Sequence, residues 1–323
     1  MNYNEKFDID KPLWDQSTYI GRVKHYFFIS EFNTVVSEKK LWEAKKFCDD
    51  YKMGKIPPGT DMSDIIRAKQ LRDSAFHLET GELLPMLGRL SYQLPVSVIL
   101  TTAMLTFQKS TAVMVASQMI NHMHNAIINY TYRIPRVSDD KNQMRNAFLC
   151  AVLASTIMTV TCKKLLYQRT HSYSRCVPFC GVAIGHVVNL PIVRYKDIAL
   201  GMPLFLKDEK TPLMKSKVAA LKGTTECIIS RILMSLPCLL LVPVLTQKIM
   251  TPCFSQRQPW LLAFIETSLC AFFCAYAVPF IMAIFPERNS MSPTLLKLYP
   301  GEYDNFKELV KKDVDKVYYN KGL

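Results

Sequence analysis

Although the sequence contains ten cysteines, it lacks any C-x-x-C pair. Most of the ten lie inside apolar runs, so neither a disulfide framework nor a zinc site is expected. Cys176 with Cys180, and Cys270 with Cys274, have the i,i+4 spacing that places two thiols on one face of a helix. Buried small hydrophobic side chains are the simpler interpretation of these pairs. The sequence therefore predicts no metal site and no cofactor.

The first ten residues lack the features of a cleaved targeting segment. They contain Glu5, Asp8 and Asp10 and no arginine, which is the wrong charge for a mitochondrial presequence. They also lack the apolar core of a secretory signal peptide. Any targeting signal is therefore expected to be internal.

The sequence also lacks the combinations of side chains that enzymes need. His77 and Glu79 could form an acid/base pair, but no nucleophile with an orienting partner accompanies them. No glycine-rich phosphate loop or metal ligand set is present either. We therefore predict that the protein is not an enzyme, and that His77, Glu79 and Thr80 form a gating loop or cap before the first apolar run.

Charged side chains are nearly absent from long stretches beyond Arg89. Five apolar runs have membrane-compatible length, namely Leu90–Phe107, Asn146–Cys162, Cys176–Val193, Ile232–Gln247 and Pro259–Pro286. A soluble helical bundle would need charged outer faces on these helices. We therefore predict an all-α, multi-span helical integral membrane protein with about five spans and a transmembrane helical domain over residues 90–286.

The remaining segments have mixed charge. Residues 1–89 are predicted to form a soluble helical N-terminal domain, with one helix beginning after Ser37 and a second around Met62 to Ile66. Residues 287–323 are predicted to be a soluble C-terminal tail. The net charge of +13 is spread over many segments, so it does not identify a partner. Membrane lipid is expected and nucleic acid is not.

A polar helix is predicted over residues 117–133, with no acid and no Lys or Arg before Arg133. At 100° per residue an uncharged polar stripe occupies an arc of roughly 100°, formed by Gln118, Asn121, His122, Asn125 and Asn129. Such a stripe indicates either buried amides that bond to neighbouring helices or a polar path through a membrane. If this helix also spans, there are six spans and the termini share one side. If it does not, there are five and they lie on opposite sides.

Two charges lie within or next to the apolar runs. Arg231 directly precedes the fourth run, and Glu266 is the only charge in the fifth. A buried ion pair between them would explain both, because a lone buried charge is costly.

Several short motifs, read in order, carry a resemblance to a known family. They are Trp14 to His25 (WDQSTYIGRVKH), Pro57 to Thr60 (PPGT), Asp73 to His77 (DSAFH), Asn129 to Thr131 (NYT), Val177 to Phe179 (VPF), Ile229 to Arg231 (ISR) and Phe285 to Pro286 (FP). The chain resembles the sideroflexins over essentially its whole length. The ending Tyr319 to Leu323 (YNKGL) is similar to the second branch of that family.

The resemblance implies a multi-pass transporter of the mitochondrial inner membrane. The expected substrate is serine or a similar small neutral amino acid, in support of one-carbon metabolism. Such a zwitterion needs hydrogen-bond donors and acceptors inside a low-dielectric site. The substrate-pathway residues are predicted to be Gln118, Asn121, His122, Asn125, Asn129 and Thr131.

Departures from the family pattern leave alternatives open. The family's His-Pro-Asp-Thr loop reads His77-Leu78-Glu79-Thr80, and the polar helix carries His122 and His124. His186, Glu226 and Glu287 likewise stand where the family usually has neutral amides. One alternative is a membrane adaptor or assembly factor that no longer transports. Another is a role in iron or haem homeostasis that would use the histidines, and His122 could also carry a coupling proton.

Overall fold

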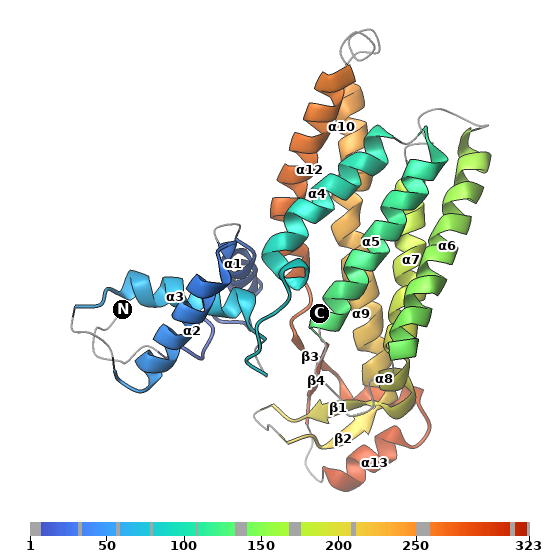
Figure 1. The fold of residues 1–323 in the computed structure, drawn as a ribbon. Helices are drawn as coiled ribbons and strands as arrows, with labels where there is room; N and C mark the ends of the chain where they lie inside the picture. The colour runs from blue at the N-terminus through green and yellow to red at the C-terminus, as the bar shows by residue number, and fades with distance from the viewer. Residues whose placement is uncertain are drawn as a thin grey trace.

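The computed structural model describes residues 8–31, 34–55, 59–77, 80–107, 109–132, 141–167, 176–207, 211–249, 259–310 and 314–321. Figure 1 shows a bundle of long helices with a small helical unit at one side and a small sheet at one end. The helical unit contains α1 (Tyr19–Ser30), α2 (Glu38–Lys52) and α3 (Met62–Ala75), followed by the 3-10 turn η2 (Met86–Gly88).

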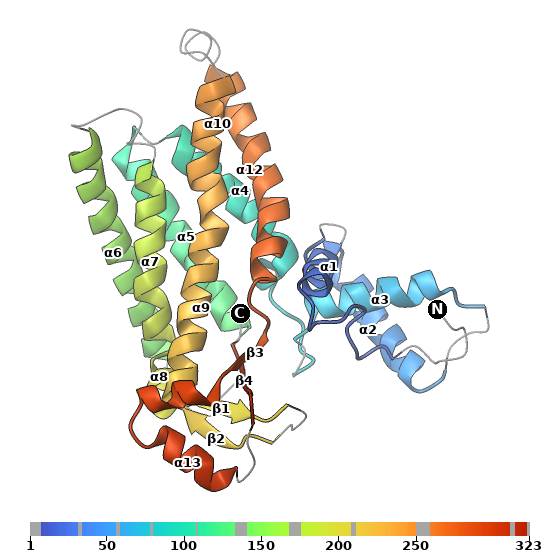
Figure 2. The ribbon, with the colours of Figure 1, turned by 180° about the vertical axis from the view of Figure 1, so that it is seen from behind.

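The bundle consists of long helices that run up and down side by side (Figures 1 and 2). They are α4 (Leu90–Thr106), α5 (Thr111–Thr131), α6 (Lys141–Tyr167), α7 (Val177–Val193), α9 (Lys217–Leu236) and α12 (Pro259–Met282). α9 continues through a π-helical turn, η4 (Pro237–Leu241), into α10 (Val242–Ile249). Pro237 begins that turn, where its missing N–H interrupts the ordinary hydrogen-bond ladder.

All five predicted apolar runs are helical. In the described part of the chain, three helices are long and apolar enough to cross a membrane, namely Asn142–Leu165, Lys217–Ile249 and Trp260–Met282. Leu90–Thr106 and Val177–Val193 are shorter apolar helices. Leu153, Ile157 and Phe264 point outward with 62%, 65% and 64% of their surface exposed, where a soluble protein would carry charge. The protein is a helical, multi-pass membrane protein.

Small side chains let α6 pack closely in the bundle. Its buried stripe repeats every four residues, and Ala147, Ala151, Ser155 and Thr159 are all 0% exposed. Opposite them on α7, a Cβ at Gly181 would overlap the Thr159 hydroxyl. Closely approaching backbones at small residues are typical of helix packing in membranes.

The helix α5 buries its polar face and exposes its apolar face, as its sequence predicts. Gln118 and His122 are each 1% exposed, whereas Met119 and Met123 are 50% and 48% exposed. The uncharged polar side chains therefore face the interior and the apolar ones face outward. α5 packs between α4 and α6 as a full member of the bundle.

The N-terminal unit has its own small apolar core. α2 begins directly after Ser37, as predicted, and Leu41 and Cys48 pack with Ile65 and Phe76. α1 joins this unit to the bundle, because Tyr19 Oη donates to the Phe280 carbonyl at 3.0 Å and Arg22 Nε donates to the Ala283 carbonyl at 2.8 Å.

A four-stranded antiparallel sheet was not predicted and corrects the all-α expectation in this part of the chain. Its order is β2 (Met214–Ser216), β1 (Met202–Phe205), β4 (Val317–Asn320), β3 (Arg288–Met291). β1 pairs with β4 through Leu204 opposite Tyr319. The sheet shares an apolar core with α8 (Tyr195–Leu200), η5 (Pro293–Leu298) and α13 (Glu302–Leu309) at the N-terminal end of α9.

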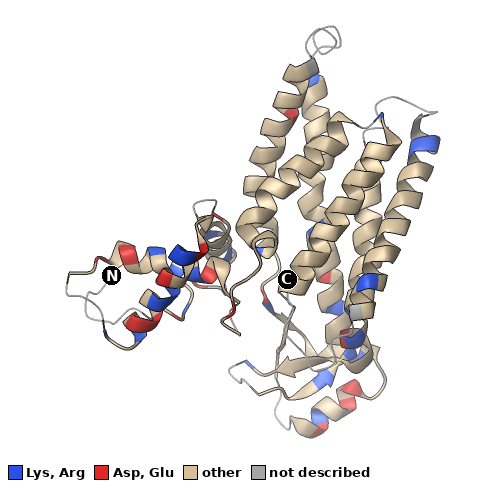
Figure 3. Ribbon diagram, viewed as in Figure 1, with Lys and Arg blue, Asp and Glu red and all other residues tan. Residues whose placement is uncertain are grey.

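Charge separates these parts of the molecule (Figure 3). Lys, Arg, Asp and Glu gather on α1 to α3 and around the sheet and α13, while the bundle carries few charges. The charged units lie towards the same end of the bundle, where α4 begins and α12 ends. Any polar site inside the bundle is therefore enclosed by an apolar surface.

Candidate functional site

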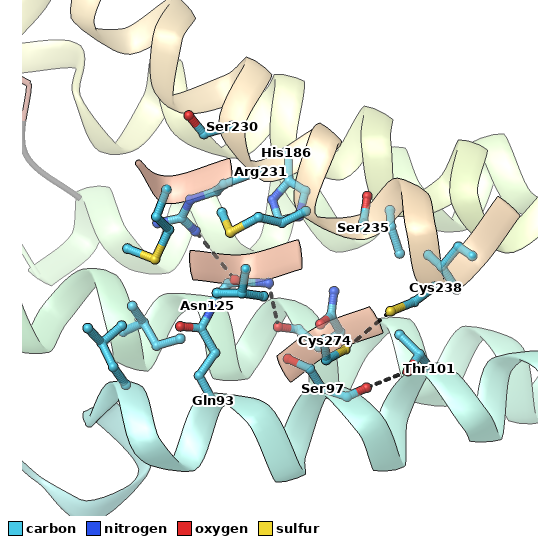
Figure 4. Close-up of a pocket in the computed structure, with 18 of the residues that line it drawn as sticks. Gln93, Ser97, Thr101, Asn125, His186, Ser230, Arg231, Ser235, Cys238 and Cys274 are labelled. Atoms are coloured by element: carbon cyan, nitrogen blue, oxygen red, sulfur yellow. Dashed lines mark hydrogen bonds between the residues drawn. The ribbon is translucent and has the colours of Figure 1, made fainter. Parts of the chain in front are cut away.

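A cavity of about 120 Å³ lies inside the bundle between α4, α5, α7, α9, η4 and α12 (Figure 4). Tyr26 of α1 and Lys321, which follows β4, also reach it. Its polar lining consists of Gln93, Ser97, Thr101, Asn121, Asn125, His186, Ser230, Arg231, Ser235 and Lys321. Apolar and thiol side chains, including Met104, Val182, Cys238 and Cys274, form the rest.

The guanidinium of Arg231 is the central charge of the cavity. Arg231 is 9% exposed, and its Nη2 donates to Oδ1 of Asn129 at 2.6 Å. Its Nη1 makes a longer contact of 3.4 Å with Oδ1 of Asn125, across the cavity (Figure 4). These two amide oxygens carry no formal charge, and a guanidinium has further N–H donors to offer. The site can therefore bind an anionic group.

Hydroxyl groups on α4 and α9 present acceptor atoms to the same cavity. Thr101 Oγ1 donates its proton to the Ser97 carbonyl at 2.6 Å, and Ser230 Oγ donates to the Glu226 carbonyl at 2.8 Å. Ser235 Oγ donates likewise to the Ile232 carbonyl at 2.9 Å. Because each hydroxyl proton is already used, the oxygen lone pairs remain available to accept from a bound donor.

Two of the six predicted pathway residues line the cavity, Asn121 and Asn125. Asn129 is not among the lining residues; its Oδ1 accepts from Arg231 and so orients the guanidinium. Asn129 Nδ2 also contacts Asn189 Oδ1 at 3.4 Å. Asn125 Nδ2 donates to the Asn121 carbonyl at 2.9 Å, one helical turn earlier. The polar stripe of α5 therefore contains residues that line the cavity and residues that orient the lining side chains.

The other predicted pathway residues make helix contacts outside the cavity lining. Gln118 Oε1 accepts from Ser155 Oγ at 2.7 Å and from Thr159 Oγ1 at 2.9 Å, which ties α5 to α6. Thr131 Oγ1 donates to the Ile127 carbonyl of its own helix at 2.8 Å and packs against Gly88. These two side chains stabilise the packing of α5.

The two histidines of α5 point in different directions. His122 packs edge-on against His186 of α7, with ring centroids 6.0 Å apart, and His186 lines the cavity. His124 instead contacts the Leu87 carbonyl at 3.2 Å. Within the described ranges, His122 Nε2 has no hydrogen-bond partner, and no group of three or more His, Cys, Asp or Glu side chains is placed to hold a metal ion.

Arg231 and Glu266 do not form the ion pair that the sequence suggested. Arg231 bonds to Asn125 and Asn129 of α5, and Glu266 Oε2 accepts from Thr106 Oγ1 of α4 at 3.1 Å. Glu266 is 2% exposed. Arg231 is hydrogen-bonded to α5 and Glu266 to α4, so the two buried charges have separate roles in the bundle.

His77 and Thr80 belong to the N-terminal unit, and neither is among the residues that line the cavity. The Thr80 N–H donates to His77 Nδ1 at 3.3 Å, and the Gly81 N–H donates to the His77 carbonyl at 2.8 Å. Lys45 of α2 donates to the Gly81 carbonyl at 2.5 Å. Glu79 lies outside the described residues.

The polar residues of α4 were missed, although the sequence carries a signal for them. Gln93, Ser97 and Thr101 are spaced four apart in an uncharged helix, so they share one face. Ser230 directly precedes Arg231 and Ser235 follows it by four residues, but they gave no such pattern. Their place at the cavity follows from the packing of α9 against α7 and α12.

Comparison with known proteins places the whole chain in one family. The family model for Sideroflexins matches residues 8–323. Sideroflexin-1 of Mus musculus is 33% identical over 317 residues, which cover 98% of this chain and 97% of that protein. Sideroflexin-3 of Rattus norvegicus is 33% identical over 317 residues (98% of each chain), and sideroflexin-2 of Bos taurus is 35% identical over 319 residues (98% of each chain). No solved structure matches. The chain belongs to the sideroflexin family.

Proposed function

We propose that this protein carries serine, or a similar small neutral amino acid, across the mitochondrial inner membrane in support of one-carbon metabolism. The observation that carries the proposal is an arginine-centred polar cavity inside a bundle with an apolar outer surface. A polar, partly charged site is costly at membrane depth and is typical of substrate pathways.

The size of the cavity supports a small substrate. Its volume of about 120 Å³ is close to the ~150 Å³ of an apolar cavity that holds one benzene molecule. A serine-sized molecule fits that volume, whereas an aromatic amino acid does not. The carboxylate would meet Arg231, and the ammonium would meet the lone pairs of neutral oxygens in the lining, such as the Thr101 hydroxyl.

The arrangement of the bundle supports movement of substrate from one side to the other. If all the long helices cross the membrane, α1 to α3 and the sheet lie on the same side, where Tyr26 and Lys321 reach the cavity. Opening there would require α1 to release its contacts with Phe280 of α12 and with Ala283, which directly follows α12. Opening on the other side would require the ends of α4 and α10 to part.

Uptake by proteoliposomes tests the proposal. Vesicles with the purified protein should take up labelled serine, alanine or cysteine above the level of empty vesicles. Asn121→Ala and Asn125→Ala should reduce uptake, because both side chains line the cavity. Asn305→Ala on the exposed face of α13 is the matched control and should not. No uptake of any of the three amino acids would contradict the proposal.

A different result would favour the alternatives. Stable co-purification with a respiratory or biosynthetic complex, together with indifference to Asn121→Ala and Asn125→Ala, would indicate an adaptor or assembly factor. Iron or haem retained after purification in mild detergent would indicate a role in metal handling.

A further inference from the structure

The described residues that line the cavity include positively charged side chains but no negatively charged ones. Two cations line it, Arg231 and Lys321, and no Asp or Glu is among the described lining residues. Glu226, one turn before Ser230, is directed elsewhere, since it accepts from Tyr319 Oη at 2.9 Å and from Asn289 Nδ2 at 2.9 Å. Glu266 is bonded to Thr106. Lys321 lies in the electrostatic field of Glu226 and Glu287, whereas the hydrogen bonds of Arg231 go to neutral amide oxygens. Among the described residues, the charge of Arg231 therefore has no matching carboxylate.

A buried arginine of this kind is incompletely compensated. The oxygens of Asn125 and Asn129 supply dipoles, and only the bond to Asn129 is short. Taking a cation out of water costs several kcal/mol unless an opposite charge and good hydrogen bonds offset that loss. A carboxylate bound in the cavity would supply the missing charge, and guanidinium and carboxylate groups match in a bidentate geometry.

The ammonium of an amino acid has no equivalent partner. Neutral hydroxyl and amide oxygens are its acceptors in the lining, including those of Thr101, Ser230 and Asn121. Such bonds replace hydration but do not neutralise a second buried charge. A ligand without a carboxylate would therefore leave the charge of Arg231 uncompensated. A ligand without an ammonium would leave only neutral acceptors without a donor, and a hydroxyl group on the ligand can donate to them instead.

We propose that the cavity recognises its ligand by the carboxylate, through Arg231, and that it also binds small 2-hydroxy monocarboxylates that have a hydroxyl where an amino acid has its ammonium. This proposal rests on the cavity being the substrate site of the proposed function. Glycerate is the direct probe, because it is serine with the ammonium replaced by a hydroxyl. Ethanolamine is the reverse probe, since it keeps the amine and hydroxyl and lacks the carboxylate.

Thermal unfolding of the full chain in detergent, at constant ionic strength, measures binding without requiring transport. Serine and glycerate should each raise the unfolding temperature in a saturable way, whereas ethanolamine and chloride should not. Arg231→Gln should remove both shifts. A shift with ethanolamine as large as that with glycerate would overturn the proposal, as would a glycerate shift that depends on Lys321 and survives Arg231→Gln.

A second variant covers the case in which Arg231→Gln fails to fold. Asn125→Asp places a carboxylate at the position that now lies 3.4 Å from Nη1 of Arg231. This internal carboxylate should raise the unfolding temperature of the ligand-free protein and remove the glycerate shift, because it takes the place of the ligand's charge. A glycerate shift of wild-type size in Asn125→Asp would contradict the assignment of Arg231.

The outcome for this proposal is separable from the outcome for serine transport. Serine uptake in vesicles with no glycerate shift would sink the present proposal and leave the proposed function standing. An Arg231-dependent glycerate shift without uptake of serine, alanine or cysteine would support carboxylate recognition by the cavity and contradict the proposed transport of these amino acids.

Discussion

Nη2 of Arg231 on α9 donates to Oδ1 of Asn129 on α5 at 2.6 Å, although 102 residues separate them in the chain. This bond fixes the guanidinium between two helices and leaves its other donors at the cavity. Asn129 lies outside the cavity lining, so its role is to position Arg231 and to link α5 with α9.

Asn129→Ala should lower the free energy of unfolding by about 1.5–3 kcal/mol, the usual range for a hydrogen bond to a charged group. The reason is that Arg231 would keep only its long contact with Asn125. Asn129→Asp should be far less harmful, since it places an opposite charge beside the guanidinium. Denaturant unfolding in detergent measures both, with Asn305→Ala on α13 as the control. Equal stability of Asn129→Ala and wild type would refute this role.

A double-mutant cycle tests the separation of Arg231 from Glu266. Because they bond to different helices, the effects of Arg231→Ala and Glu266→Ala should add within about 0.5 kcal/mol. If the double variant is more stable than Arg231→Ala, the two charges interact and the arrangement described above is wrong.

Gly185→Ala should disrupt the packing of α7 against α5. A Cβ at Gly185 would overlap the ring of His122, so we expect a loss of about 1–3 kcal/mol from overpacking. Gly223→Ala is the matched control, because a Cβ there would be 3.4 Å from Tyr319 Cε2, an ordinary contact. Unfolding midpoints should fall for Gly185→Ala and stay or rise for Gly223→Ala. A smaller residue at position 122 should restore part of the loss.

The sheet depends on Glu226 of α9. Tyr319 Oη donates to Glu226 Oε1 and Oε2 at 3.0 and 2.9 Å, and burial together with this carboxylate raises the pKa of the Tyr319 phenol above its ordinary value of 10.0. A raised pKa means that the stabilising effect of Tyr319 is complete below pH 10 and declines as the pH rises further, because the unfolded state then ionises first.

Tyr319→Phe should therefore be less stable than wild type at pH 8, and the difference between them should shrink above pH 10. Unfolding of both proteins at pH 8 and pH 10.5 measures this, and Tyr195→Phe on the exposed face of α8 is the control. A difference that grows with pH would contradict the assignment.

The sequence predicted those features that depend on one helix at a time. Uncharged runs predicted the positions of α4, α6, α7 and α12, and of the end of α9 with η4 and α10. The amide stripe of α5 predicted which of its faces is buried. The strands were missed because each has only three or four residues. Their pairing joins residues 202–216 to 288–320, far apart in the chain.

Features that depend on which helices contact one another could not be predicted from the sequence pattern. Arg231 was singled out as an intramembrane charge, but its partners depend on how the bundle places α9 opposite α5. The amide stripe likewise gave no means of telling Asn125, which lines the cavity, from Gln118, which bonds to α6. Tertiary contacts alone separate the amides that line the cavity from those that bond to neighbouring helices.

Uptake of labelled serine by proteoliposomes that contain wild type or Asn125→Asp tests the central claim most directly. The account predicts uptake well above empty vesicles for wild type, and uptake at the level of empty vesicles for Asn125→Asp, even though that variant should fold at least as stably. Wild-type vesicles that take up no more serine than empty ones, or an Asn125→Asp variant that transports like wild type, would contradict it.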